Sequence, residues 1–221
     1  MSFDDMKIVT LNIQQGGGSR VREIVYYLRL KNADVIVLTE LRDNSRAQAL
    51  RSELAASDFV HFATPATSFG ENSVGIFAIR PFVPQTYPHL SAGDRHRLIS
   101  AHFDEITVVG AYFAQKKEKA SLFHFLLNGG LASIEAPYVL VGDFNTGLHE
   151  IDEAGRTFHC AKDFSALSHA GLVDAWRSRN PGKREYSWYS NAGNGFRIDH
   201  VFANPAANYR VQQVHYDHAP R

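Results

Sequence analysis

The sequence predicts a single mixed α/β domain in which β-sheets are sandwiched together and helices cover their outer faces. The chain has 221 residues, 44% of them hydrophobic, which is enough for one substantial core and short for two. Segments rich in β-branched and aromatic residues alternate with segments of helical periodicity. Several of the apolar segments are continuous, as in strands that are covered on both faces. We therefore expect one domain spanning residues 1–221.

Seven segments have the composition of strands. They cover residues 6–13, 34–40, 74–80, 98–103, 106–113, 138–144 and 196–203. The segments 98–103 and 106–113 follow each other without a helix between them, which favours mixed rather than purely parallel sheets.

Helical periodicity accounts for much of the chain between the strands. One helix is expected after Ser19, a candidate N-cap, and another directly before the "NGG" turn. Leu50 and Leu54 indicate a further helix. The apolar faces of the first two helices consist of Val21, Ile24, Val25 and Leu28, and of Leu122, Phe125 and Leu126.

Charge and cysteine content narrow the classes of function. The 23 basic and 23 acidic residues cancel, so no global field attracts nucleic acid or an anionic membrane. Cys160 is the only cysteine, which excludes an internal disulfide and a cysteine-rich zinc site. The start, "MSFDDMKIVTLNI", lacks the pattern of a secretory signal, and no apolar stretch could span a bilayer. We expect a cytoplasmic protein with no membrane partner and no obligate protein partner.

Polar residues stand where the apolar strands stop. Asn12 and Glu40 end the first two strands, Tyr112 lies near the end of the fifth, and Asp143 and Asn145 end the sixth. Such residues fit a site at one common edge of a sheet sandwich, where loops carry the chemistry. Each also has a structural interpretation, as a turn former, a helix-entry acid or a core aromatic.

Metal-assisted phosphoester hydrolysis would use this set of residues. Mg²⁺ takes oxygen ligands, usually one or two carboxylates with water and substrate phosphate, and Glu40 assisted by the Asn12 amide oxygen meets that description. Mn²⁺ would accept the same oxygens. Asp143 would orient and deprotonate a water, and Asn145 and Tyr112 would stabilise developing charge. Because no serine or cysteine nucleophile has a recognisable signature, direct water attack is preferred.

The segment "FRIDHVFA" carries a further acid. Asp199 would need a partner if buried, and Arg197 lies on the same strand face, so both a structural ion pair and a catalytic carboxylate stay open. His200 alternates with apolar residues and is interpreted as a core histidine. The cluster of Lys116, Lys117 and Lys119 fits a solvated helix start better than a nucleic-acid contact.

The motifs, taken in order, resemble the endonuclease/exonuclease/phosphatase superfamily with its DNase I-like fold. They are "TLNIQQGG", "DVIVLTE", "VVGAYFAQ", "VGDFNTG" and "FRIDHVF", and the resemblance spans residues 7 to 203. It implies a four-layer α/β/β/α sandwich of two mixed sheets flanked by helices.

Two further segments, "GLVDAWRSRNP" and "YSWYSNAGNGFRID", are similar to the exonuclease III and AP endonuclease branch. This resemblance implies metal binding by Asn12 and Glu40, with catalytic roles for Tyr112, Asp143 and Asn145. It also implies that Asp199 holds a catalytic histidine. The implied substrate-binding residues are Gln115, Trp188, Phe196, Arg197 and Ile198, with Trp188, Phe196 and Ile198 lining an apolar pocket for a flipped-out abasic sugar.

The family's terminal Asp-His pair has two candidate positions. "YDHAPR" supplies Asp217 and His218, with His218 as general base or electrostatic partner of the phosphoryl group. Alternatively this segment is the approach loop and the pair lies beyond Arg221, in which case residues 1–221 lack the last strand.

The expected function is that of a Mg²⁺- or Mn²⁺-dependent phosphodiester hydrolase, a nuclease with DNA as the favoured substrate. The neutral net charge favours one alternative, a phosphatase or phosphodiesterase for a small-molecule or lipid phosphoester. A second alternative is a non-catalytic binding module of the same fold.

Overall fold

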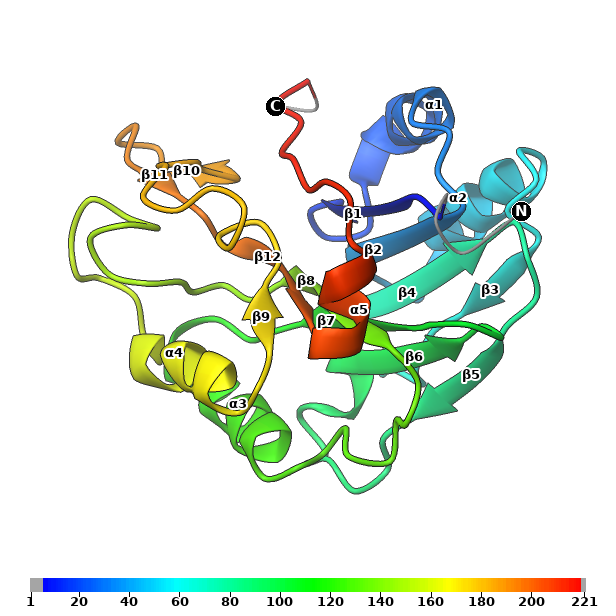
Figure 1. Cartoon of the computed structure of the whole chain (residues 1–221). Helices are drawn as coiled ribbons and strands as arrows, with labels where there is room; N and C mark the ends of the chain where they lie inside the picture. The colour runs from blue at the N-terminus through cyan, green and yellow to red at the C-terminus, as the bar shows by residue number, and fades with distance from the viewer. Residues whose placement is uncertain (1–5, 220–221) are drawn as a thin grey trace. The chain divides into compact units, whose positions relative to one another are not determined.

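The computed structural model describes residues 6–219, and these divide into two compact units, residues 6–112 and residues 113–219 (Figure 1). Residues 1–5 of the opening segment and the last two residues of "YDHAPR" lie outside the described range. Within that range, no helix is both long enough and apolar enough to cross a membrane. The prediction of a single domain stays a prediction, and each unit is described by itself.

The first unit begins with a βαβ element. Strand β1 (Ile8–Asn12) runs parallel to β2 (Val35–Leu41), and α1 (Val21–Leu30) connects them, as parallel strands require. Strand β4 (Ser73–Ala78) pairs antiparallel with β2, and β3 (His61–Ala63) pairs antiparallel with β4. The resulting sheet is mixed and has the order β1-β2-β4-β3.

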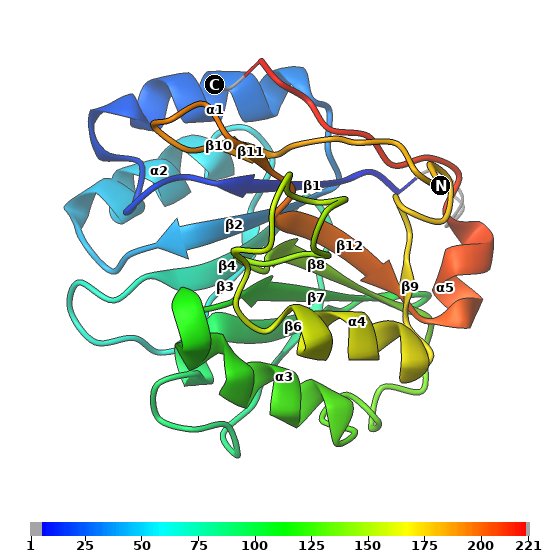
Figure 2. The same cartoon turned by 90° about the vertical axis from the view of Figure 1, so that its left-hand side faces the viewer.

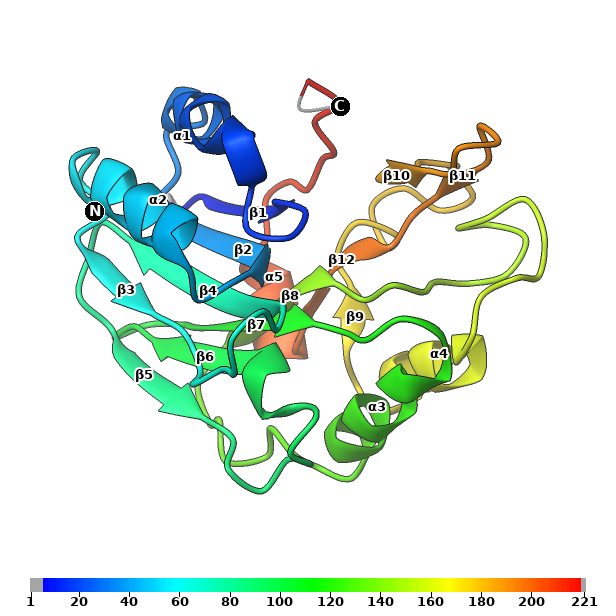
Figure 3. The ribbon, with the colours of Figure 1, turned by 180° about the vertical axis from the view of Figure 1, so that it is seen from behind.

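Two helices cover one face of this sheet (Figures 1 and 3). Helix α2 (Ser45–Ala55) begins after Asn44, whose side chain accepts a hydrogen bond from the Ala47 backbone nitrogen. The apolar faces of α1 and α2 form one buried cluster with alternate residues of β2 and β4. Its members include Ile24, Leu28, Leu50, Leu54, Ile36, Leu38 and Phe77.

The opposite face of the sheet packs on a second layer of strands within the same unit. Strands β5 (Val83–Thr86), β6 (Leu98–His102) and β7 (Thr107–Tyr112) pair antiparallel in that order. A Cβ atom at Gly110 of β7 would lie 3.0 Å from side-chain atoms of both Val37 and Val74. The two layers therefore approach closely enough at this position to favour glycine. Short 3₁₀ turns, η2 (Gly18–Arg20) and η3 (Arg95–Arg97), complete the unit.

The second unit also builds strands against helices. Strand β12 (Asp199–Ala203) pairs antiparallel with β8 (Tyr138–Asp143) and with β9 (Val173–Asp174), giving the order β8-β12-β9. Helices α3 (Ala120–Leu127) and α4 (Ala161–His169) lie side by side (Figure 2). Packed aromatic rings hold this layer together, with Phe113 stacked on Phe144 at 4.5 Å and tilted against Phe123 at 4.6 Å.

Smaller elements complete the second unit. Strands β10 (Trp188–Tyr189) and β11 (Gly195–Phe196) form an antiparallel ribbon. The 3₁₀ turn η4 (Lys116–Lys119) precedes α3, and α5 (Pro205–Arg210) follows β12.

All seven predicted strand segments contain a strand, and α1, α2 and α3 lie where the three helices were expected. Three details are wrong. Ser19 lies inside η2, and α1 begins after Arg20, without a side-chain cap. In α3, Phe123 rather than Phe125 is fully buried. Residues 196–203 are not one strand, because β11 ends at Phe196 and β12 starts at Asp199.

Candidate active site

Glu40 is held in a strained backbone conformation at the end of β2. Its φ of 58° lies in the left-handed region, at a β-bulge between Thr39 and Leu41. A non-glycine residue there costs free energy, and such strain concentrates at functional sites. One carboxylate oxygen accepts a hydrogen bond from Asn12 Nδ2 at 3.0 Å, and the other accepts one from the Gln15 backbone nitrogen at 2.8 Å. The bulge thus presents a half-buried carboxylate with a fixed orientation.

Tyr112 ends β7 in the same unit. Its side chain is buried, its hydroxyl accepts a hydrogen bond from Asn72 Nδ2 at 3.4 Å, and the Arg97 guanidinium stacks 5.1 Å from the ring centre. These contacts orient the phenol beside a cation. Gln115 follows in the second unit, where it is exposed and precedes η4.

In the second unit, Asp143 and Asn145 form one tight turn. Asp143 is buried at the end of β8, and its Oδ1 accepts a hydrogen bond from the Asn145 backbone nitrogen at 2.8 Å. Asn145 has a φ of 51°, and its Nδ2 donates to the Phe113 carbonyl at 2.8 Å. An amide nitrogen has two hydrogens, so the Asn145 side chain keeps donor capacity for another acceptor.

Lys119 stabilises this turn through a buried hydrogen bond. Although Lys116 and Lys117 are exposed, Lys119 is buried, and its Nζ donates a 2.7 Å hydrogen bond to the Asn145 carbonyl. Burial lowers the pKa of Lys119, and Cys160 and Asp143 act against that shift. The prediction of a solvated helix start is therefore wrong for Lys119, which was not among the expected site residues.

Asp199 faces Asp143 across the β8–β12 pair, where the two residues are register partners. Directly opposed residues of an antiparallel pair project to the same side of the sheet, so the two carboxylates are neighbours. Burial raises the pKa of Asp199, and the Ser187 hydroxyl and His200 oppose the change only in part. The second unit thus places two acids, in different environments, on one side of its strands.

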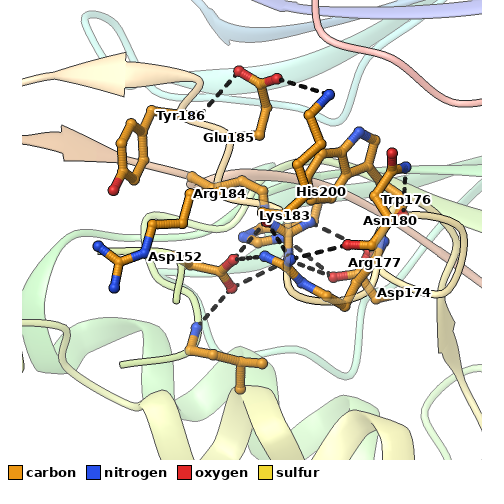
Figure 4. A network of polar contacts seen from close by, with 12 residues as sticks. Asp152, Asp174, Trp176, Arg177, Asn180, Lys183, Arg184, Glu185, Tyr186 and His200 are labelled. Atoms are coloured by element: carbon orange, nitrogen blue, oxygen red, sulfur yellow. Dashed lines mark hydrogen bonds and ion pairs between the residues drawn. The ribbon is translucent and has the colours of Figure 1, made fainter. Parts of the chain in front are cut away.

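Arg197 does not pair with Asp199, contrary to the expectation from the strand pattern. Its guanidinium is fully buried and binds Asp152 at 2.8 Å and Asp174 at 2.6 Å. Figure 4 shows Asp152 and Asp174 in their network of polar contacts. Arg177 also contacts Asp152, at 2.6 Å. The contacts of this enclosed guanidinium are structural ion pairs, and the substrate-binding role implied for Arg197 stays a prediction.

This network also holds the C-terminal segment. The Tyr216 hydroxyl donates to the Asp199 carbonyl at 2.6 Å and accepts from Arg197 at 3.5 Å, and its ring packs edge-on against Trp176. Two residues later, His218 is exposed and lies 2.9 Å from a Glu185 carboxylate oxygen. The structure therefore places His218 against Glu185, whereas the resemblance implies a histidine held by Asp199.

The three residues expected to line an apolar pocket lie close together in the second unit. Trp188 and Phe196 are register partners of the β10–β11 ribbon with ring centres 5.5 Å apart, and Phe158 packs against Phe196 at 5.6 Å. Trp188 is 45% exposed. Half-buried Ile198 follows, with its backbone nitrogen bonded to the Ser187 hydroxyl at 3.0 Å. The ribbon thus presents an accessible aromatic surface.

His200 has the core environment that its position predicts. It is buried, packs against Phe144 and Phe164, and donates through Nε2 to the Thr146 carbonyl at 2.8 Å. That hydrogen bond secures the backbone directly after Asn145, and the His200 ring also opposes the rise in the pKa of Asp199.

The donor set of the first unit fits a hard divalent cation. Each Glu40 oxygen accepts one hydrogen bond and retains a second lone pair. Among residues 6–219, no three His, Cys, Asp or Glu side chains gather as a metal cage. Mg²⁺ does not need one, since it keeps several waters and binds proteins through one or two carboxylates. Asn12 offers Glu40 its amide nitrogen, so it suits the role of orienting the carboxylate.

Comparison with known proteins agrees with this fold. The model of the Endonuclease/Exonuclease/phosphatase family matches residues 9–221. An AP endonuclease from Archaeoglobus fulgidus superposes with a TM-score of 0.75 at 21% identity, covering 92% of this chain and 88% of that one. A 3′ phosphatase from Neisseria bound to product DNA hairpin gives 0.76 at 22%, covering 92% and 88%. A 3′-5′ exonuclease from Neisseria meningitidis gives 0.74 at 22%, covering 92% and 89%.

The fold shared with these structures confirms the mixed α/β sandwich with its DNase I-like arrangement. With the family match over almost the whole chain, it defines the class of protein as a phosphoester hydrolase. The chain belongs to the endonuclease/exonuclease/phosphatase family.

Proposed function

We propose that the protein is a divalent-metal-dependent phosphodiester hydrolase, a nuclease acting on DNA at ends or abasic sites. The observation that carries this proposal is the Glu40 carboxylate, held at a strained bulge by Asn12 and Gln15. Strain of this kind persists where the surrounding contacts over-determine it, and it clusters at functional sites. The cytoplasm remains the predicted compartment.

Glu40 would hold Mg²⁺ or Mn²⁺, with Asn12 orienting the carboxylate. When bound, the cation would polarise the phosphoryl group and neutralise charge that develops on its oxygens. Asp143 would accept a proton from the water that attacks phosphorus, since its position is fixed by the turn with Asn145. Asn145 would donate its second amide hydrogen to a phosphoryl oxygen.

Tyr112, whose ring lies beside the Arg97 cation, would assist departure of the leaving oxygen. Asp199 and Asp143 would have separate roles, because burial raises the pKa of Asp199 and favours its protonated form. His218 stays a candidate electrostatic partner of the phosphoryl group. To serve there, it would have to leave Glu185, and ion pairs of exposed side chains are weak enough to permit this.

DNA is favoured as the substrate because the three similar structures are named as an AP endonuclease, a phosphatase with a DNA hairpin and an exonuclease. The exposed Trp188 beside Phe196 supplies a stacking surface of the kind that receives extruded nucleotides. The neutral net charge keeps a small phosphoester as the second candidate.

The test is hydrolysis with Mg²⁺ or Mn²⁺ of four substrates: an abasic-site duplex, a plain duplex, an RNA strand and bis-p-nitrophenyl phosphate. We expect incision at the abasic site, loss of activity with EDTA, and loss of activity in Glu40→Gln but not in Glu53→Gln, an exposed control. Turnover of the small ester alone would replace the nuclease by a small-molecule phosphodiesterase. No turnover of any substrate would favour the binding module.

Replacing Lys119 by methionine should lower kcat about 10–100-fold, because small displacements of reacting groups are costly. Methionine fills the same buried space but cannot hold the Asn145 carbonyl. Steady-state kinetics should show the change in kcat rather than in KM. Lys117→Met is the matched control, since Lys117 is exposed in the same turn. Equal kcat values for the two variants would contradict a positioning role.

A further inference from the structure

The first unit contains a polar cavity that none of the roles above uses. Its volume is about 400 Å³, and it opens between the end of β2, helix α2 and the segment that follows β3. Two cations, one acid and three hydroxyl groups contribute to its lining. They are Arg42, Arg51, Asp43, Thr64, Thr67 and Ser73.

Arg51 is the cation with the least satisfied hydrogen-bonding capacity. Its guanidinium stacks 4.2 Å from the Phe62 ring centre, and its Nε is buried without a hydrogen-bond partner among residues 6–219. Burial lowers the pKa of Arg51, and Asp43 only partly offsets that effect. A desolvated cation is costly, and an anion beside the guanidinium in the cavity would offset the cost of its buried charge, although the enclosed Nε itself cannot reach the anion.

Arg42 connects the cavity with the candidate active site in the same unit. It follows Glu40 by two residues, and its Nε donates to Asn72 Oδ1 at 2.6 Å. Asn72 in turn donates to the Tyr112 hydroxyl at 3.4 Å. One short chain of contacts therefore links a wall of the cavity to a residue proposed to act on the leaving oxygen.

The charge and polarity of the cavity lining indicate which kind of ligand would bind there. Two guanidinium groups against one carboxylate leave a positive balance, which repels a metal ion, and the polar lining disfavours an apolar ligand. Guanidinium forks match phosphate oxygens in geometry and charge. The Thr64 and Ser73 hydroxyl groups already bond to each other and to the Val74 carbonyl, so the two arginines carry the recognition.

We propose that this cavity binds a phosphate group of the substrate other than the one that is hydrolysed. The proposal rests on the proposed function, and it narrows the substrate to a strand that carries more than one phosphate. A nucleic-acid strand has such groups on either side of the reacting phosphate, whereas a simple monophosphate ester does not. A free or terminal phosphate would satisfy the same chemistry and is distinguished below.

The test measures binding to the full chain in EDTA, so that no turnover occurs. The probes are a fluorescein-labelled hexathymidylate, followed by fluorescence anisotropy, and inorganic phosphate, followed by calorimetry. Arg51→Met keeps an unbranched side chain at this position and removes both the charge and the guanidinium that lies over Phe62. It should weaken hexathymidylate binding about tenfold and reduce the salt-dependence slope by about 0.7, the value for one lost phosphate contact on a single strand.

Two variants sharpen the comparison. Arg46→Met removes an exposed cation from the same helix, outside the cavity, and should leave the affinity within about twofold of the wild type. Arg51→Lys retains a point charge and should recover most of the salt dependence. Circular dichroism melts show which variants are folded.

If folded Arg51→Met binds both hexathymidylate and phosphate as tightly as the wild type does, the proposal is overturned. Loss of phosphate binding alone would keep the anion site and assign it to a free or terminal phosphate. The phosphate-site proposal and the proposed function can fail independently of each other. A chain that hydrolyses nothing but loses binding with Arg51→Met would refute only the hydrolase, and an active chain indifferent to Arg51→Met would refute only the phosphate site.

Discussion

We expect Asp143→Asn to lower kcat by about 10²–10⁴-fold, the range measured for loss of a general acid or base. Asparagine keeps the size of the side chain and an oxygen that can accept the hydrogen bond from the Asn145 backbone nitrogen. The turn should therefore persist while the proton acceptor is lost. The loss should appear in kcat, with KM changed little, because the group acts in the transition state.

The measurement is metal-dependent hydrolysis by purified variants on whichever substrate the wild type turns over. Asp104→Asn, an exposed residue of the turn between β6 and β7, is the control and should behave as wild type. A kcat for Asp143→Asn within about threefold of the wild type would remove Asp143 from the mechanism, since that is below any general-base contribution.

Arg197→Met should destabilise the second unit by about 3–5 kcal/mol, because it leaves buried carboxylates without their counter-ion. Asp152 and Asp174 both bind this guanidinium, and both are largely or fully buried. Urea unfolding followed by tryptophan fluorescence measures the effect, since both tryptophans, Trp176 and Trp188, lie in this unit. A loss below about 1 kcal/mol would contradict the structural role.

The exposed pair Arg156 and Glu150 provides the matched control. Their charged groups are 3.1 Å apart, but their side chains are 71% and 64% exposed. Arg156→Met should change the free energy of unfolding by about 0–1 kcal/mol, as is usual for surface ion pairs. The comparison separates the effect of burial from that of removing an arginine.

The Arg197→Met effect should also depend on pH. Burial alone would raise the pKa of Asp174, but His200 and Arg197 outweigh it and hold that pKa well below its usual range. A carboxyl with a lowered folded-state pKa contributes stability above its unfolded pKa, about 3.9, and loses it as pH falls towards the folded pKa. In the variant, protonation relieves the buried charges. The difference between variant and wild type should therefore shrink below about pH 4.

The apolar strands were predictable because their signal is local. Runs such as residues 35–41 and 138–143 are long, continuous and rich in β-branched residues, so their neighbours in sequence define them. Short strands such as β9, β10 and β11 have two residues each and were missed. Two residues are too few to show a strand pattern, and β9 also depends on β12, a partner further along the chain.

The positions of Asn12, Glu40, Tyr112, Asp143 and Asn145 were also predictable, because each follows an apolar run at a strand end. Their roles stay proposals. The left-handed conformation of Glu40 could not be predicted, since only the bulge between β2 and β4 and the contacts from Asn12 and Gln15 over-determine it.

The contacts of charged side chains could not be predicted from the sequence and depend on the tertiary structure. By itself, the sequence determined the strands, the order of the motifs and the residues at the strand ends, because periodicity and turn chemistry act between near neighbours. Only the tertiary structure decided that Lys119 holds a carbonyl 26 residues away, and that Arg197 binds Asp152 and Asp174 at separations of 45 and 23 residues. A buried charge takes whichever counter-charge the fold brings within reach, and that distance is set by packing rather than by sequence spacing.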